Sequence, residues 1–384
     1  MERSGTTPSF GVEAGELADV AELFELAGPF LSVFLDTEPD MENAAQRFTA
    51  RWASLRQRLA QRGVPTGLLD QAGERLTAEY ASGPAVAVLA SAQGRALTVV
   101  GHTALGPEVA AWDSLPRVAP LVAWHQSSPP ALLVVMDRTG ADLITAGHGR
   151  VHREEVAGDD SPVIHRSAPG GWSQRRYQQR AENRWRANAG DVARRVGELA
   201  DELRARLVVV AGDVRAVQLM LDQLPERVAG LVRLVSGGRG EGSEGHLEDE
   251  VRRWYRTAVA EDTVALLEAF KEELGQRDRA VAGMADTVAS LNAAAVETLL
   301  VHDDPSGPRR LFFSPQNPML VSEDADTLLE LGEEYRDGRA VDTLIRAAWT
   351  GGAAVRIVTR LPELGEGVGA ILRYARQSVP GTSG

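Results

Sequence analysis

The sequence predicts an α/β fold in which helices cover largely parallel or mixed sheets. Uninterrupted apolar runs such as ALLVVMD (131–137) and RLVVVAG (206–212) are typical of buried strands. They alternate with segments whose apolar residues recur every three or four positions, which is the spacing of amphipathic helices. Strands and helices in this alternating order indicate sheets that are covered by helices.

Length and composition limit the classes to which the protein can belong. The chain has 384 residues, of which 43% are hydrophobic and 25% charged, as in globular proteins of two or three domains. It contains no apolar run of about 18 residues and no basic, apolar leader, so a cytoplasmic protein without a membrane segment is expected. Cysteine is absent, which excludes disulfides, thiolate catalysis and Cys-ligated metals. No cofactor and no bound metal are expected.

The first of three predicted domains spans residues 1–128. A short lead-in with one helix precedes the strand FLSVFLD (30–36), and a helix follows to Gly63 because Phe48, Trp52 and Leu55 lie at helical spacing. Two further strands are expected at 84–91 and 94–102. The polar, proline-rich segment WHQSSPP (124–130) is interpreted as a hinge to the second domain.

The second and third predicted domains span residues 129–276 and 277–384. The second begins with strands over 131–156 and continues with a non-periodic Gly/Asp/Ser/Pro segment at 157–173, a helix of some thirty residues, a strand, a helix, a strand and a long helix at 247–274. Long segments without periodicity in compact domains tend to be functional. The third is predicted as another α/β layer, with helices at 279–294 and 340–350, strands at 297–303, 309–314, 353–360 and 370–374, and a disordered tail, QSVPGTSG.

A basic island interrupts this acidic chain, whose net charge is −13. Between Arg166 and Arg195 the sequence holds eight arginines against two acidic residues. Arg176, Arg180 and Arg184 are four residues apart, so on a helix they form a row about 6 Å apart, beside an apolar stripe. Such a row suits successive phosphates, because each guanidinium can donate two hydrogen bonds to phosphate oxygens. RNA is therefore the expected partner, and neither DNA nor a membrane is expected.

The segment before this helix, PGGWSQRRYQQR (169–180), resembles the Gly-Gly-Gln loop of the class-one peptide-chain release factors of eukaryotes and archaea. VETLLVHDD (296–304) and GVGAILRY (367–374) are similar to the opening and closing strands of that family's third domain. The blocks follow the same order over residues 25–376. The chain is identified as a bacterial member of this superfamily, related to Balon-type ribosome hibernation factors and Vms-type peptidyl-tRNA hydrolases.

The resemblance implies three α/β domains in the release-factor and Pelota arrangement, and a ribosome-binding factor that docks in the A site. Its central domain would place Gly170 and Gly171 near the peptidyl-transferase centre, to protect idle ribosomes or rescue stalled ones. A translational GTPase is a possible further partner. The RNA-binding residues would be Gly170, Gly171, Trp172, Ser173, Arg175, Arg176, Tyr177, Arg180 and Arg184.

Two departures from the family pattern bear on mechanism. Trp172 occupies the position of the hydrolytic glutamine, so hydrolysis of peptidyl-tRNA would have to use Gln174, two residues later. The first block has no lysine, whereas release factors read stop codons there with a lysine-containing loop, which argues against stop-codon decoding.

An alternative from another class is a metal-dependent RNA hydrolase that uses Asp137, Asp142 and Asp213 at strand ends. Aspartates are also ordinary turn and cap residues, which is the structural interpretation of the same three positions. His148 and His152 are four residues apart but fall in a predicted hairpin, where they need not share a face.

Overall fold

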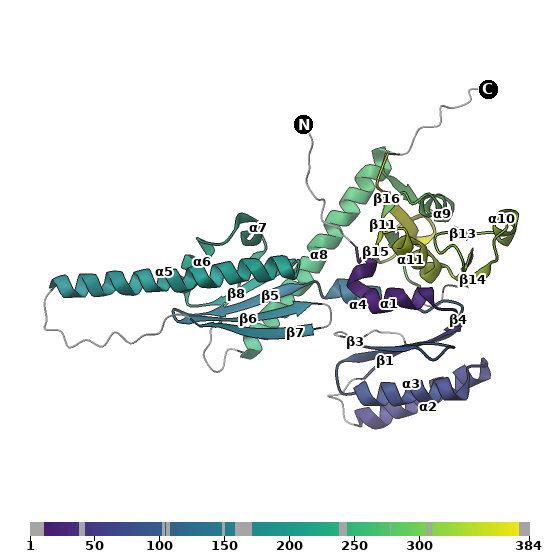
Figure 1. The fold of residues 1–384 in the computed structure, drawn as a ribbon, viewed down its shortest axis with the longest axis horizontal. Coiled ribbons are helices and arrows are strands. Elements are labelled where there is room, and N and C mark those ends of the chain that lie inside the picture. The colour runs from purple at the N-terminus through teal and green to yellow at the C-terminus, as the bar shows by residue number, and fades with distance from the viewer. Residues whose placement is uncertain are drawn as a thin grey trace. The chain divides into compact units, whose positions relative to one another are not determined.

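The computed structural model describes residues 11–37, 43–101, 104, 108–147, 150–157, 171–237, 244–276, 278–304, 307 and 309–375, without the side chains of 150, 171–181 and 244–248. Its mixed α/β architecture confirms the predicted fold class (Figure 1). The chain divides into two compact units, one of residues 127–261 and one that combines 1–126 with 262–384. The tail QSVPGTSG, predicted to be disordered, lies outside the described residues.

The unit of residues 127–261 is built on a five-stranded sheet in the order β7-β6-β5-β8-β9. β5, β8 and β9 are parallel, whereas β6 and β7 pair antiparallel with their neighbours. The runs ALLVVM and LVVVAG form β5 and β8 because parallel strands are covered on both faces and need apolar residues throughout. The strands are β5 (Ala131–Met136), β6 (Gly140–Gly147), β7 (Arg150–Ala157), β8 (Leu207–Gly212) and β9 (Val232–Leu234).

Helices cover both faces of this sheet. α5 (Gly171–Glu202), α6 (Val214–Leu221) and α7 (Glu226–Ala229) pack on the face to which Val208 and Val210 point. The alternate residues Leu207 and Val209 point to the opposite face, where they meet Trp254 and Tyr255 in the first half of α8 (Glu244–Gln276). The period-two alternation of β8 therefore divides its side chains between two apolar layers.

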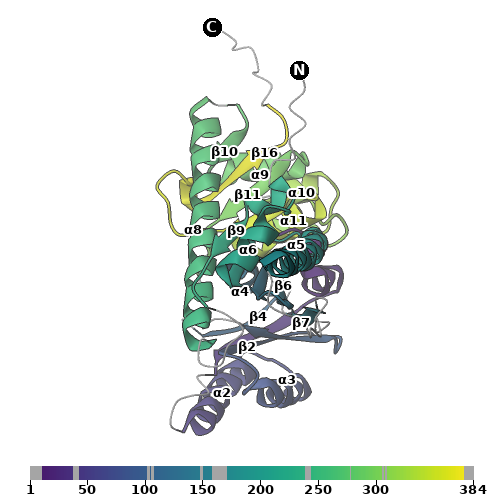
Figure 2. The ribbon, with the colours of Figure 1, turned by 90° about the vertical axis from the view of Figure 1, so that its left-hand side faces the viewer.

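The N-terminal part of the other unit is a four-stranded antiparallel sheet in the order β3-β2-β1-β4. α2 (Ala44–Gln61) and α3 (Thr66–Glu79) cover one face, against Leu31, Val33 and Leu35 (Figure 2). Phe30 and Phe34 point to the opposite face, into a core that includes residues of the C-terminal part. The strands are β1 (Phe30–Asp36), β2 (Ala85–Ser91), β3 (Ala96–Gly101) and β4 (Val109–Asp113).

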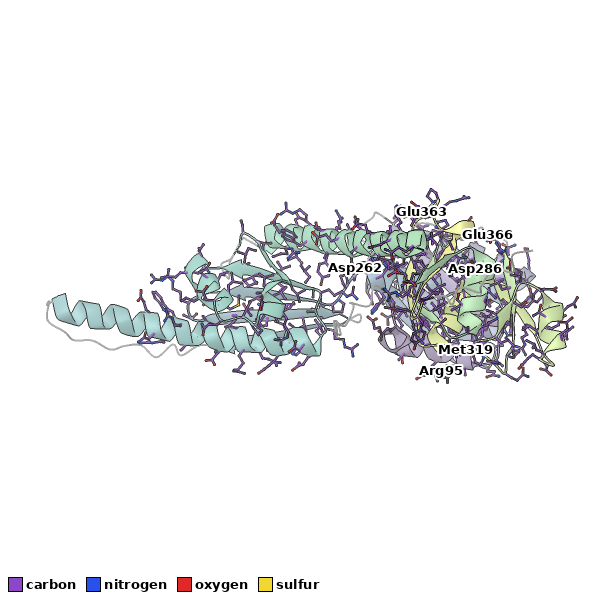
Figure 3. All side chains as sticks on the ribbon, turned by 90° about the horizontal axis from the view of Figure 1, so that it is seen from above. Arg95, Asp262, Asp286, Met319, Glu363 and Glu366 are labelled. Carbon is purple, nitrogen blue, oxygen red and sulfur yellow. The ribbon has the colours of Figure 1, made fainter. Side chains whose placement is uncertain are left out.

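The C-terminal part contains a sheet in the order β10-β16-β11-β15 and a small sheet in the order β13-β12-β14. Asp262, which is labelled in Figure 3, lies in the second half of α8 and forms a 2.9 Å ion pair with Arg356 of β15 in the same unit. The elements are β10 (Ala280–Ala282), α9 (Met284–Asn292), β11 (Val296–Val301), β12 (Arg310–Phe313), β13 (Val321–Ser322), α10 (Ala325–Glu330), β14 (Arg336–Arg339), α11 (Ala340–Thr350), β15 (Ala354–Ile357) and β16 (Val368–Leu372).

The two parts of this unit are joined through the start of the chain. Val12 and Val355 exchange backbone hydrogen bonds of 2.7 and 3.0 Å, so residue 12 extends the edge of β15. The short helices that follow, η1 (Ala14–Leu17), α1 (Ala18–Ala21) and η2 (Glu22–Glu25), bury Val20, Leu23 and Phe24 in the shared core. Where the sequence predicts one helix, the structure has three short helical segments. Their buried side chains Val20, Leu23 and Phe24 pack in the core that the N-terminal and C-terminal parts of this unit share.

Two helices of the N-terminal part are absent from the sequence-based interpretation. α3 follows α2 directly, and α4 (Ala119–Ser127) occupies the beginning of the predicted hinge at 124–130. Trp124 is buried against Phe34, and Gln126 exchanges two hydrogen bonds with the backbone of Ile357 (2.6 and 2.9 Å). The segment predicted as a hinge is therefore helical over residues 124–127, while the boundary between the two compact units does fall inside it, between residues 126 and 127. Within the described part of the chain, no helix has the length and apolar character needed to cross a bilayer.

Candidate nucleic-acid interface

The most prominent feature of the unit of residues 127–261 is the 32-residue helix α5, which is longer than the sheet that it covers. Figures 1 and 3 both show its N-terminal half extending beyond the strands. Among the side chains described on α5, burial begins at Asn188 and continues through Ala189, Val192, Ala193, Val196, Leu199 and Ala200. The predicted apolar stripe is thus confirmed from Ala189 to Leu199, and about four turns of helix precede the packed half.

The predicted site residues lie at the start of this projecting half. Gly170 is outside the described residues, while Gly171 is the first residue of α5. Trp172, Ser173 and Gln174 therefore have helical backbone and form the first turn, although the sequence suggests a loop. Arg184 is half-buried, and the side chains of the other predicted residues lie outside the description: Trp172, Ser173, Gln174, Arg175, Arg176, Tyr177 and Arg180.

The arginines at the other end of the basic island are held by the protein's own acids. Arg195 donates to both carboxylate oxygens of Glu154 on β7, at 2.6 and 2.9 Å, and to Glu198 at 3.2 Å. These hydrogen bonds lower the pKa of Glu154 and raise that of Arg195. Arg194 pairs with Glu198 at 3.0 Å. Arg194 and Arg195, at this end of the basic island, are therefore engaged in ion pairs within the protein.

A cluster at the carboxyl ends of β5 and β8 marks where α5 leaves the sheet. Two guanidiniums lie over the indole of Trp185, that of Arg138 at 4.7 Å and that of Arg215 at 5.6 Å from the ring centre. Arg138 pairs with Asp213 at 3.1 Å, and Arg215 pairs with Glu182. The apolar spacing of α5 indicates a core position for Trp185, but the side chain is half-buried and cationic groups flank it.

Neither Arg138 nor Arg215 is singled out as a functional residue by the sequence-based interpretation. The sequence does contain a signal that the two arginines lie near each other. Each follows closely on one of two apolar runs, and these runs form the adjacent parallel strands β5 and β8. The carboxyl ends of parallel strands meet at one edge of a sheet. The pairing of both arginines with one indole depends on the position of α5 across that edge, which spacing along the chain does not specify.

The three aspartates of the hydrolase alternative have structural roles. Asp137 accepts hydrogen bonds from the N–H groups of Thr139 (2.7 Å) and Gly140 (3.1 Å) in the β5–β6 turn. Asp213 caps α6 by accepting from the N–H groups of Arg215 and Ala216, both at 3.1 Å, and the Ala216 bond lowers its pKa.

Asp142 pairs with Arg153 at 3.5 Å. His152 is exposed on β7, and His148 lies outside the described residues. The part of the chain that the structure describes contains no group of three His, Cys, Asp or Glu side chains that could hold a metal ion. The arrangement therefore lends no support to the hydrolase alternative.

Two family models match most of the chain. Residues 130–276 match the model of bacterial archaeo-eukaryotic release factor family 2, and residues 260–376 match that of eRF1 domain 3. The first match includes the whole of α5 with its projecting half, and the second includes the sheet formed by β10, β16, β11 and β15.

Individual proteins are similar over comparable lengths. The uncharacterized protein Rv2629 of Mycobacterium tuberculosis is 32% identical over 366 residues, which cover 91% of this chain and 94% of that protein. The archaeal translation termination factor aRF1 is 17% identical, with 94% and 99% coverage and a TM-score of 0.26. Dom34 of Saccharomyces cerevisiae is 11% identical, with 75% and 77% coverage and a TM-score of 0.40.

Proposed function

Because the chain belongs to the bacterial archaeo-eukaryotic release factor family, we propose that it is a ribosome-binding translation factor that docks in the A site. In this proposal the unit of residues 127–261 directs Gly170 and Gly171 towards the peptidyl-transferase centre. The protein acts there in ribosome hibernation or rescue, and a translational GTPase escorts it. Its location is the cytoplasm, where ribosomes lie.

The observation that carries the proposal is the projection of α5 beyond its sheet (Figure 1). The fourteen residues from Gly171 to Arg184 precede the first buried side chain described on the helix, and at 1.5 Å per residue they span about 20 Å. A narrow helical arm of this length can enter a cavity that would exclude the rest of the unit. Gly170 and Gly171, at its start, add little bulk and permit close approach of the backbone to RNA.

The charge along α5 supports an RNA partner. The four arginines at positions 175, 176, 180 and 184 all fall in the projecting half of α5. A cationic arm on an acidic protein favours binding at one orientation, because the remaining surface is repelled by the phosphate backbone. We propose that these arginines contact rRNA or tRNA phosphates.

The start of the arm favours occupation of the site over hydrolysis. Trp172 replaces the glutamine that positions water in release factors, and its indole can instead stack on a base. Residues two apart on a helix point in very different directions, about 200° around the axis. With the first turn of α5 formed, Gln174 would not occupy the direction that belongs to position 172. Hydrolysis through Gln174 remains the second candidate and requires this turn to unwind.

Site-specific crosslinking tests the proposal. A photoreactive phenylalanine analogue at position 172 should crosslink to 23S rRNA at the peptidyl-transferase centre of vacant ribosomes, and tRNA in the A site should compete with it. The same analogue in place of Glu226, on α7 of the same unit, serves as the control and should give a different pattern. Crosslinks from position 172 that map away from the peptidyl-transferase centre, or that A-site tRNA does not reduce, would refute the proposed docking.

A further inference from the structure

We propose that Trp185, whose ring contacts the guanidiniums of Arg138 and Arg215, is the positioning residue that fixes the direction of the projecting half of α5. These three residues are called the Trp185 clamp below. The clamp itself is a property of the isolated protein, whereas its consequence for reaching the peptidyl-transferase centre rests on the proposed function. Its residues come from three places in the fold: Arg138 follows β5, Trp185 lies in α5 and Arg215 lies in α6.

The contacts place the clamp at the root of the arm. Asn188, three residues after Trp185, is the first described side chain of α5 that is buried, and its amide donates to the backbone carbonyl of Arg138 at 3.2 Å. On the preceding turn, Glu182 and Asn183 are both exposed. Trp185 is therefore the large ring that stands at the boundary between the packed half of α5 and the half that leaves the sheet.

Charge explains why the clamp holds α5 rather than serving as a phosphate site. Each flanking guanidinium already has a carboxylate partner, Asp213 for Arg138 and Glu182 for Arg215. A guanidinium next to a carboxylate can still lie over an aromatic face, where the ring quadrupole attracts it. Glu182 and Trp185 are about one turn apart on α5, so both contact Arg215 of α6 from the same side of the helix.

Because the arm is long, a small bend at the clamp displaces the start of α5 by several ångströms. The arm is about 20 Å long from Gly171 to Arg184, so a swing of about 10° at its root moves the start of the helix by about 3.5 Å. Misplacement by about 1 Å is enough to impair a reacting or occupied site. A single aromatic ring that contacts guanidiniums from two different elements, the β5–β6 turn and α6, ties the root of the arm to two parts of the unit at once.

Distance measurements between spin labels test the clamp without ribosomes. The chain has no cysteine, so Gln178→Cys on the arm and Glu226→Cys on α7 can be labelled without background. Double electron–electron resonance should give a narrow distance distribution for the parent protein. Trp185→Ala should widen it about twofold, and Trp185→Phe, which keeps an aromatic ring for the guanidiniums to contact, should stay close to the parent.

A matched pair of arginine variants distinguishes loss of the contact with Trp185 from a general loss of folding. Arg215 and Arg227 are equally exposed (56%), and each pairs with a carboxylate, but of the two only Arg215 contacts Trp185. Arg215→Gln should widen the distribution, whereas Arg227→Gln should not. An unchanged width in Trp185→Ala, or equal widening in the two arginine variants, would overturn the clamp. A widened distribution with full ribosome binding and unchanged crosslinks would leave the clamp standing and count against the proposed function.

Discussion

The indole N–H of Trp349, in α11, donates a 3.0 Å hydrogen bond to the backbone carbonyl of Val12, 337 positions earlier in the chain. The same Val12 pairs with Val355, and Phe24 packs edge-on against the Trp349 ring at 6.0 Å. The start of the chain is thereby part of the core that the C-terminal sheet and helices form.

We expect this junction to make residues 1–126 and 262–384 unfold together. Trp349→Phe removes the hydrogen bond and some buried ring area, so it should reduce the free energy of unfolding by about 1–3 kcal/mol. Urea titration should give one transition for probes in both parts of the unit. Trp254→Phe is the control, because the Trp254 N–H has no hydrogen-bond partner to lose among the described residues. Separate transitions for the two parts would contradict a shared core.

The ion pair of Arg195 with Glu154 should contribute to stability in a pH-dependent way. The pKa of Glu154 is lowered in the folded state, so the stabilisation is present above its unfolded pKa of about 4.5 and is lost as the pH falls through the folded value. Arg195→Gln should cost up to about 1 kcal/mol at pH 7, and progressively less as the pH falls below 4.5 and through the lowered pKa of Glu154 in the folded state. Chemical denaturation across this pH range measures this. Arg194→Gln, at a more exposed position, should have the smaller effect, and a pH-independent loss for Arg195→Gln would exclude the ion pair as its cause.

Gly212, the last residue of β8, should not tolerate a side chain. Its φ is +140°, and an added Cβ would lie 1.8 Å from the carbonyl oxygen of Met136, which is backbone and cannot move aside. Gly212→Ala should destabilise the unit of residues 127–261 by about 3 kcal/mol or more. At Gly197 in α5 the nearest atom would be 3.6 Å away, so Gly197→Ala should stabilise by about 0.5–1 kcal/mol. Thermal unfolding of both variants distinguishes the two outcomes.

Ribosome binding should depend on salt through the arginines of the arm. Contact with roughly three phosphates predicts a slope of about −2 to −3 in log affinity against log salt concentration. The triple change of Arg176, Arg180 and Arg184 to Gln should flatten this slope in co-sedimentation. Arg252, Arg253 and Arg256 on α8 provide a control triple with the same change in net charge. Equal effects of the two triples would assign the salt dependence to net charge rather than to the arm.

Release of nascent chains should not depend on Gln174. If the protein occupies the site without hydrolysis, the parent protein and Gln174→Ala should both release peptide from peptidyl-tRNA at the background rate. Trp172→Gln restores the glutamine at the position that release factors use and tests whether the arm can support hydrolysis. Release by the parent protein that Gln174→Ala abolishes would favour the peptidyl-tRNA hydrolase alternative.

Much of the local structure follows from the sequence because it depends on neighbours along the chain. The apolar runs specify β1, β5, β8 and β11, and the stripe from Ala189 to Leu199 specifies the packed face of α5. The missed helices α3 and α4 show the limit. In α4, Trp124 and Gln126 are held by contacts with Phe34 and Ile357, which no local pattern contains.

The α/β class, the order of the blocks, the basic island and the replacement of glutamine by Trp172 can all be read from the chain before it is folded. Three other features became visible only in the packed molecule: the ion pair of Arg195 with Glu154, the contacts of Arg138 and Arg215 with the Trp185 ring, and the pairing of Val12 with the C-terminal sheet. Composition and spacing act between near neighbours in the chain. Charge pairing, ring contacts and strand pairing depend instead on which distant residues the core brings within a few ångströms.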